Sequence, residues 1–247
     1  MLAKSRQNML VNIVNRKKSV SVLDLMKKLQ VSEVTIRRDI IALDKAGLLR
    51  KVHGGALSIR SIQEIDSDVS FRENHNIEAK KHIAKFAAKL IEDYECIYLD
   101  AGSTIGCMID YIHAEHINVV TNSITHARRL TALGITTYLL GGCLKVSTDA
   151  MVGDDAITML DTYHFAKGFF GSNGVDKVYG FTTPDRREAE VKKHALKKCK
   201  HSYILIDDSK FDTISAVQFA HIQDATVLSN TMSENYIEFE NVKGVDT

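Results

Sequence analysis

The feature that most constrains the fold is an alternation of short apolar runs and amphipathic segments from residue 78 onward. The apolar runs lie at 96–100, 117–121, 135–140, 165–170, 202–207 and 226–230. Segments with helical spacing lie beside them, at 78–93, 104–113, 123–133, 154–162 and 185–199. Apolar strands that alternate with helices form a mainly parallel sheet with helices on both faces. The larger part of the chain, residues 76–247, is therefore predicted to be an α/β domain.

The first 57 residues have a different pattern. Apolar residues recur there at helical spacing over 5–17, 22–29 and 33–47. Ser21 and Ser32 stand just before the second and third segments and can cap them as helices. Two short helices joined by a tight turn describe a helix-turn-helix. We therefore predict a DNA-binding domain at 1–57 and a polar linker at 58–75.

The buried faces of these helices follow from a rotation of about 100° per residue. On the third helix the buried side is expected at Ile36, Ile40 and Leu43. On the second helix the buried stripe is expected at Leu23, Met26 and Leu29. The opposite side of the third helix is left to solvent.

That solvent side carries Thr35, Arg37 and Arg38 near the start of the helix. Side chains there reach base edges and phosphates when such a helix lies in a major groove, and guanidinium suits both targets. A solvated basic helix face is the alternative. The basic stretch that follows has two glycines and suits a hairpin that would lie along the DNA backbone as a wing. The predicted DNA-binding residues are Ser32, Thr35, Arg37, Arg38, Arg50, Lys51, His53 and Gly54.

The charge distribution agrees with this division. Residues 1–58 hold 12 basic and four acidic residues, a net of +8, and the remainder holds 20 and 27, a net of −7. A basic head on an acidic body is expected when only the head meets a polyanion. The stretch S-E-V-T-I-R-R-D-I (32–40), followed by L-L-R-K-V-H-G-G-A (48–56), resembles the DNA-binding head of DeoR-family bacterial repressors. The resemblance implies that Asp39 orients an arginine and that His53-Gly54-Gly55 closes a winged helix-turn-helix.

Polar turns follow three successive predicted strands. They are Asp100-Ala101-Gly102-Ser103-Thr104, Thr121-Asn122-Ser123 and Gly141-Gly142. Ligands of such sheets bind at the carboxyl ends of strands. A Gly-Ser-Thr turn that opens a helix offers a phosphate N–H groups, hydroxyls and the positive end of the helix dipole. Ordinary helix capping is the alternative for each turn alone; together the turns predict a phosphate site.

Two later segments add charged residues. Glu188 and Lys192 are four apart on the helix at 185–199 and share a face, with a surface ion pair as the alternative. The strand at 202–207 ends in Asp207-Asp208-Ser209-Lys210. A lysine just past a strand end can neutralise a phosphate as a point charge.

In order, D-A-G-S-T, T-N-S, L-L-G-G, G-S-N-G-V-D, E-A-E-V-K and D-D-S-K-F resemble the sensor half of the DeoR family, which is similar in fold to ribose-5-phosphate isomerase. The resemblance implies that the Gly-Ser-Thr turn cradles a phosphate. The predicted effector-binding residues are Asp100, Gly102, Ser103, Thr104, Asn122, Gly141, Gly142, Glu188, Lys192, Asp207 and Lys210. The stretches Y-G-F-T-T-P-D and E-A-E-V-K are most like the fructose-operon repressors, whose effector is fructose 1-phosphate.

An enzyme is the rival class. Sugar-phosphate isomerisation needs a carboxylate that moves a proton beside a phosphate cradle, and Asp100, Glu188 and Asp207 could serve. Ribose-5-phosphate isomerases carry Asp-Gly-Ala-Asp-Glu and Lys-Gly-Gly-Gly runs, which this sequence lacks. A dinucleotide-binding redox sensor is disfavoured because GxGxxG and CxxC are missing. We expect no catalytic residue, no cofactor and no metal site, and the His113-Ala114-Glu115-His116 run is expected to be a polar helix end.

No apolar run approaches the roughly 18–20 residues that span a bilayer, and no signal peptide is evident. The expectation is therefore a cytoplasmic transcriptional repressor of a sugar-utilisation operon. Its expected partners are double-stranded operator DNA, a small phosphorylated sugar and further copies of the chain, with no membrane. At least a dimer is expected because helix-turn-helix proteins usually read repeated half-sites. The sequence leaves open which sugar phosphate is sensed.

Overall fold

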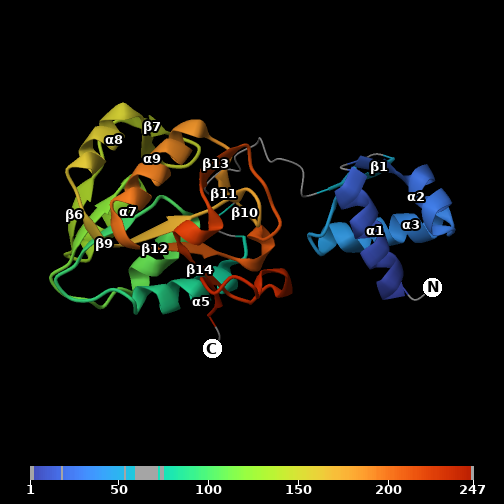
Figure 1. The fold of residues 1–247 in the computed structure, drawn as a ribbon, viewed down its shortest axis with the longest axis horizontal. Helices are drawn as coiled ribbons and strands as arrows, with labels where there is room; N and C mark the ends of the chain where they lie inside the picture. The colour runs from blue at the N-terminus through green and yellow to red at the C-terminus, as the bar shows by residue number, and fades with distance from the viewer. Residues whose placement is uncertain (1–2, 18, 53, 59–71, 73–74, 246–247) are drawn as a thin grey trace. The chain divides into compact units, whose positions relative to one another are not determined.

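The computed structural model describes residues 3–17, 19–52, 54–58, 72 and 75–245. The chain divides into two compact units, residues 1–63 and 64–247 (Figure 1). Most of the predicted linker at 58–75 lies outside the described residues, and so does His53. Each unit is described by itself.

The first unit combines helices with a small antiparallel sheet. The helices are α1 (Ala3–Lys17), α2 (Val22–Leu29) and α3 (Glu33–Lys45). The strands are β1 (Ser19–Ser21), β2 (Arg50–Val52) and β3 (Gly55–Leu57), in the order β1-β3-β2. The predicted hairpin is therefore confirmed as β2–β3, and β1 adds a strand where the sequence indicated only a break between helices.

Both predicted caps are present. The predicted buried stripe of α2 is right at Leu29, has Met26 half-buried against the same core, and is wrong at Leu23. The Oγ atoms of Ser21 and Ser32 accept hydrogen bonds from the backbone in the first turns of α2 and α3. The buried residues of α3 include Ile36, Ile40 and Leu43, as predicted. On α2 the buried residues are Val22, Leu25 and Leu29, whereas Leu23 is 65% exposed. The observed set spans about 60° of the helix and the predicted set about 120°, so the observed set forms the narrower stripe.

The second unit is built on a seven-stranded sheet whose neighbouring strands all run parallel, in the order β15-β14-β12-β9-β4-β5-β6. Its strands are β4 (Cys96–Leu99), β5 (Asn118–Thr121), β6 (Thr136–Leu139), β9 (Phe165–Gly171), β12 (Cys199–Ile206), β14 (Thr226–Ser229) and β15 (Val242–Gly244). The six predicted strands are confirmed, and β15 adds one at the edge.

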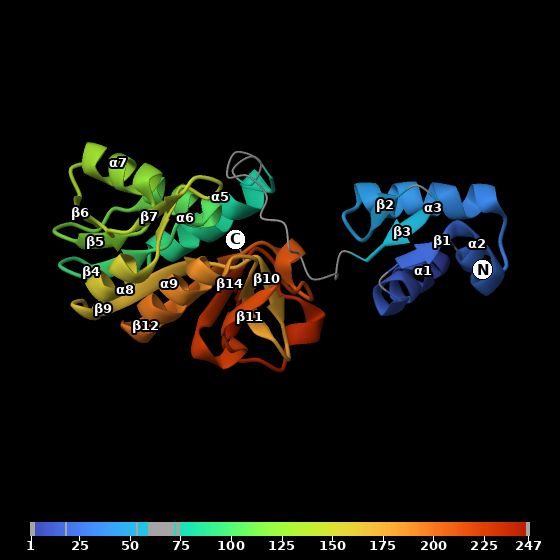
Figure 2. The ribbon, with the colours of Figure 1, turned by 90° about the horizontal axis from the view of Figure 1, so that it is seen from above.

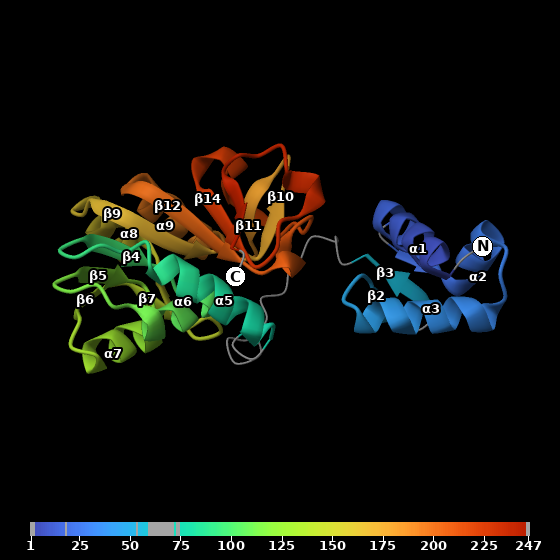
Figure 3. The same cartoon turned by 90° about the horizontal axis from the view of Figure 1, so that it is seen from below.

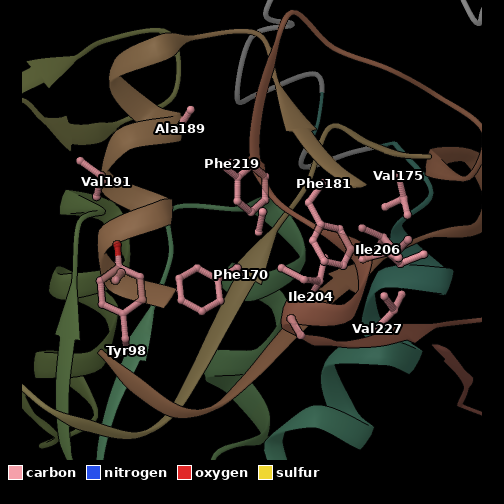
Figure 4. Close-up of a cluster of buried hydrophobic side chains, with 14 of the residues drawn as sticks. Tyr98, Phe170, Val175, Phe181, Ala189, Val191, Ile204, Ile206, Phe219 and Val227 are labelled. Atoms are coloured by element: carbon pink, nitrogen blue, oxygen red, sulfur yellow. The ribbon is translucent and has the colours of Figure 1, made fainter. Parts of the chain in front are cut away.

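Helices cover both faces of this sheet. They are α5 (Ile77–Ala88), α6 (Ser103–Met108), α7 (Ile124–Ala132), α8 (Asp154–Asp161) and α9 (Arg186–Lys197). Successive strand residues face opposite sides. Tyr98 and Phe170 therefore pack with α8 and α9, as Figure 4 shows for the α9 side. Ile97 and Phe169 pack with α5, α6 and α7 on the other face.

Two smaller strand groups complete the unit. One is the antiparallel sheet of β10 (Gly174–Asp176), β11 (Gly180–Thr183) and β13 (Val217–Ala220), and the other is the hairpin of β7 (Cys143–Lys145) and β8 (Ala150–Val152). Short 3-10 turns lie at η1 (Ile109–Tyr111), η2 (Asp208–Lys210), η3 (Ile222–Asp224) and η4 (Glu234–Tyr236). Figures 2 and 3 both show β10 and β11 at the end of the unit away from β6.

The order of the strands creates a crevice. From β4 the chain adds β5 and β6 toward one edge, whereas β9, β12, β14 and β15 extend toward the other. Connections that leave neighbouring strands in opposite directions open a gap at the carboxyl ends of those strands, where ligands bind in such sheets. The gap lies at the carboxyl ends of β4 and β9.

Among the described helices, none has the length and apolar content needed to cross a membrane.

Candidate functional site

The outward side of α3 presents two arginines. Arg37 and Arg38 are both exposed, while Thr35 is half-buried and its hydroxyl lies 3.0 Å from that of Ser32. Arg37 pairs with Glu33 one turn earlier, at 2.6 Å. Arg38 has no hydrogen bond or ion pair with any described residue. Its guanidinium is therefore fully available to a partner, and that of Arg37 is shared.

Asp39 binds an arginine, but not one on the outward side of α3. Its buried carboxylate accepts a hydrogen bond from Nε of Arg6 at 2.6 Å and one from Nε2 of Gln7 at 3.0 Å. Both donors lie on α1. Asp39 therefore fixes α1 against α3 and sets the angle at which α3 is presented.

The β2–β3 hairpin begins with two exposed cations. The side chains of Arg50 and Lys51 are exposed, as is Gly54, whose φ of 81° is the left-handed conformation that glycine adopts easily. The backbone N–H of Lys51 donates to Asp44 near the end of α3, at 2.8 Å. The hairpin is thereby tied to the helix beside it.

A cavity opens in the second unit at the carboxyl ends of β4, β5, β9 and β12, and we call it the strand-end cavity. Nine of the predicted effector-binding residues line it, namely Asp100, Gly102, Ser103, Thr104, Asn122, Glu188, Lys192, Asp207 and Lys210. Further lining residues, which were not among the predicted effector-binding residues, include Arg72, His75, Lys80, Thr148, Gly171, Ser172 and Asn173; the last three belong to the G-S-N-G-V-D stretch of the resemblance.

Asp100 and Lys192 form a buried ion pair on the wall of the cavity. Oδ2 of Asp100 accepts a hydrogen bond from Nζ of Lys192 and another from the N–H of Gly171 at 3.0 Å. Nζ of Lys192 also donates to the carbonyl of Gly171 at 3.1 Å. Oδ1 of Asp100 is buried without a partner among the described residues. This oxygen can accept a hydrogen bond from a ligand hydroxyl.

Asn122 holds the turn after β4 rather than presenting free polar groups. Its Oδ1 accepts the N–H of Ala101 at 3.0 Å, and its Nδ2 donates to the carbonyl of Met151 at 3.4 Å. Both ends of the amide are therefore engaged. Asn122 shapes the turn whose next residues, Gly102 and Ser103, line the cavity.

Glu188 is buried and does not pair with Lys192. Its carboxylate accepts from the hydroxyls of Thr148 and, at 3.4 Å, Thr183, and it lies 3.3 Å from Nζ of Lys145. The expectation that Glu188 and Lys192 share a face is confirmed, and the alternative of a surface ion pair is wrong. Each has a different charged partner, Lys145 for Glu188 and Asp100 for Lys192.

The fourth strand end contributes Asp207 and Lys210. Burial alone would raise the pKa of Asp207. The charge of Lys210 and hydrogen bonds from Ser209 and Asn76 outweigh burial and lower that pKa below its ordinary value. Asp207 is therefore an ionised acceptor inside the cavity, with a lysine beside it.

The positive charge of the cavity comes from side chains. The sequence suggested a helix dipole after the Gly-Ser-Thr turn, but α6 has only six residues and few aligned peptide units. Lys80, Lys192 and Lys210 line the cavity together with Arg72. These cations lie among Asp100, Glu188 and Asp207, so the cavity suits an anion that also carries hydroxyl groups. No group of three His, Cys, Asp or Glu among the described residues could hold a metal ion.

Two protein-family models match this chain. The DeoR-like helix-turn-helix domain matches residues 6–62, and the DeoR C terminal sensor domain matches residues 75–230. This chain belongs to the DeoR family.

The DeoR relatives match over almost the whole chain. The chain is 40% identical over 250 residues to a Bacillus subtilis protein called uncharacterized HTH-type transcriptional regulator FruR, with 99% of each chain covered. It is 30% identical to the lactose phosphotransferase system repressor of Streptococcus mutans, with 92% of each covered. The sensor domain is similar in structure to ribose 5-phosphate isomerase A of Methanocaldococcus jannaschii, at 19% identity, a TM-score of 0.41 and 55% of each chain.

Two residues predicted to line the sensor site of this DeoR chain do not do so. Gly141 and Gly142 are exposed at the end of β6, the outermost strand, and are not part of the strand-end cavity. Gly142 has a φ of 115°, and a Cβ there would lie 2.6 Å from the carbonyl oxygen of Val152. The glycine is needed for the turn against β8 and not for the approach of a ligand.

Two of the missed residues, Lys80 and Thr148, lie in segments that carried no signal of a site. Lys80 lies on an amphipathic helix in which Lys81 and Lys85 look identical in composition, yet Lys80 is buried and the other two are exposed. Thr148 lies between β7 and β8, in a region for which the sequence predicted neither a helix nor a strand. Only the packing of α5 and of this hairpin against the strand ends brings them into the cavity of the DeoR sensor domain.

Proposed function

We propose that this chain is a cytoplasmic repressor of a sugar-utilisation operon, that its helix-turn-helix holds operator DNA, and that a phosphorylated sugar releases it. Fructose 1-phosphate is the best single candidate for the effector. The names of the relatives support the regulatory role, because one is a transcriptional regulator and the other a repressor of a sugar phosphotransferase system.

The observation that carries the proposal is the mixed charge of the strand-end cavity. Lysines bind phosphate as point charges, and charge-assisted hydrogen bonds of this kind are strong. Ionised carboxylates accept hydrogen bonds only, so Asp100 and Asp207 suit sugar hydroxyls. A ligand with a phosphate at one end and hydroxyls along its length satisfies both sets.

On the DNA side, Arg38 and Arg37 would contact base edges or phosphates in the major groove, with Ser32 and Thr35 beside them. Arg50, Lys51, His53 and Gly54 would follow the backbone as the wing. Reading a repeated half-site requires two heads, so the repressor is proposed to act as a dimer or a larger homo-oligomer.

The proposal is tested by two measurements on the full chain. In the first, thermal unfolding is followed with fructose 1-phosphate, other sugar phosphates and, as controls, the unphosphorylated sugars. A ligand at about a hundred times its Kd adds roughly 2.7 kcal/mol, which raises the Tm by roughly 5–11 °C for a domain of this size.

In the second measurement, duplexes selected from a random library for binding to the chain are titrated with the stabilising sugar phosphate. We expect loss of DNA binding, without conversion of the sugar. Unchanged DNA affinity at saturating ligand would exclude release as the mechanism. Conversion to an isomer would assign the cavity to catalysis instead.

A further inference from the structure

Lys80 connects the turn after β4 to the segment that precedes the sensor domain. It lies on α5 and is 4% exposed, whereas Lys81 beside it is exposed and pairs with Glu78 at 3.2 Å. Nζ of Lys80 donates to Oγ of Ser103 at 3.0 Å and to the backbone carbonyl of Arg72. One buried amine therefore holds a cavity residue and a residue nine positions after the first unit ends.

The hydrogen-bond partners of Lys80 carry no charge of their own. Both are neutral oxygens, and the ion pairs among the described residues do not include Lys80. A buried charge is costly unless a counter-charge lies close to it. Burial lowers the pKa of Lys80. The charge of Asp207 raises this pKa, and the charges of Lys210 and Arg72 lower it. An anion in the strand-end cavity would supply a counter-charge in direct contact with Lys80.

A second contact joins the same segment to another strand end of the cavity. Nδ2 of Asn76, just before α5, donates to Oδ1 of Asp207 at 2.9 Å. Arg72 and His75 themselves line the cavity. The beginning of the sensor domain is thus part of the cavity wall, held by Lys80 through Ser103 and by Asn76 through Asp207.

We propose that Lys80 contacts the phosphate of the effector and, through its bond to the Arg72 carbonyl, transmits occupancy of the cavity to the segment that leads to the DNA-binding unit. An ammonium has three N–H donors. Two are used by Ser103 and Arg72, and the third can meet a phosphate oxygen. This inference rests on the proposed function, because it names a contact and a route of regulation for the same cavity.

The consequence is a tighter hold on Arg72 when the effector is bound. A phosphate beside Lys80 stabilises the charged amine, and a charged donor makes the stronger hydrogen bond to the carbonyl. Binding in the cavity therefore holds Arg72 more firmly to α5. In a dimer, two DNA-binding units that are each attached to a firmly held Arg72 have less freedom to match the spacing of two half-sites.

The test compares Lys80→Gln with Lys81→Gln, a matched change one residue away on the exposed side of α5. Binding of fructose 1-phosphate and of inorganic phosphate is measured by calorimetry, and DNA affinity is measured with and without saturating fructose 1-phosphate. Lys80→Gln is expected to weaken binding of both probes about tenfold or more. It is also expected to bind DNA normally without ligand and to lose the ligand response at saturation. Lys81→Gln is expected to behave as the unmodified chain.

Hydrogen exchange on the unmodified chain gives a readout that does not depend on how the variants fold. With fructose 1-phosphate, the amides at 75–81 are expected to exchange more slowly, as are those at 100–104. Protection at 100–104 alone would overturn the inference, and so would a normal ligand response of Lys80→Gln. In either case the proposed function would stand. If the unmodified chain bound no sugar phosphate, the proposed function itself would fail, and the inference with it.

Discussion

The buried pair of Lys192 and Asp100 leads to a quantitative prediction about stability. Replacing Lys192 with Met removes the cation and leaves the Asp100 carboxylate, whose side chain is 1% exposed, without a counter-charge. The hydrogen bond from the Gly171 N–H remains. One backbone donor does not replace an ammonium, so the folded state of the sensor domain is destabilised.

The size of the effect follows from the burial of both groups. Removing one partner of a buried ion pair costs about 3–5 kcal/mol. For a domain of this size each kcal/mol lowers the Tm by roughly 2–4 °C, so the expected fall is roughly 6–20 °C. Adding Asp100→Asn removes the orphaned charge, and the new amide can donate to the Gly171 carbonyl that Lys192 has left. The double variant is expected to recover most of the loss.

The assay can isolate the sensor domain within the full chain. All eight Tyr and nine Phe lie after residue 63, so the near-ultraviolet circular dichroism signal of the aromatic residues reports on the second unit alone. Lys193→Met is the matched control, because Lys193 is exposed on the same helix and surface changes usually stay within about 0.5 kcal/mol.

Two results would refute the reasoning. A Lys192→Met variant that unfolds at the temperature of the unmodified chain would mean that Asp100 does not depend on this cation. A double variant that unfolds as low as the single variant would mean that the loss comes from packing of the lysine stem, and not from an uncompensated charge.

Three further predictions concern DNA, the effector and pH. Arg38→Ala should weaken DNA binding about tenfold or more and leave sugar-phosphate binding intact, with Lys45→Ala as the exposed control; equal losses of both activities would contradict the division of roles. Lys210→Ala should weaken sugar-phosphate binding about tenfold and leave DNA binding without effector unchanged; tight effector binding by this variant would remove the lysine from the site. Burial lowers the pKa of His126 in the folded state to about 4, whereas in the unfolded chain it is about 6.5. Because the unfolded state binds the proton first as the pH falls, the free energy of unfolding is highest above about pH 6.5 and decreases by about 3 kcal/mol toward pH 4. Chemical unfolding monitored by the aromatic signal should show this loss, and His126→Leu should remove it; an unchanged pH dependence in that variant would show that another group titrates.

Local patterns in the sequence determined much of the fold. The helix caps at Ser21 and Ser32, the buried face of α3 and six strands of the parallel sheet follow from spacing and residue type over a few positions. The polar turns after β4 and β5 could also be placed close together, since neighbouring parallel strands end on the same side of the sheet. These features depend on interactions between residues that are close in the chain.

The tertiary structure decided the composition of the cavity. Gly141 and Gly142 lie away from it because β6 takes the outermost place in the sheet, and strand order depends on pairings between distant segments that no local period records. Lys80 and Lys81 are indistinguishable by residue type, but the packing of α5 against the strand ends buries one and leaves the other in solvent. Asp39 likewise meets Arg6, from another helix, because contacts across the core are set by how whole elements pack together.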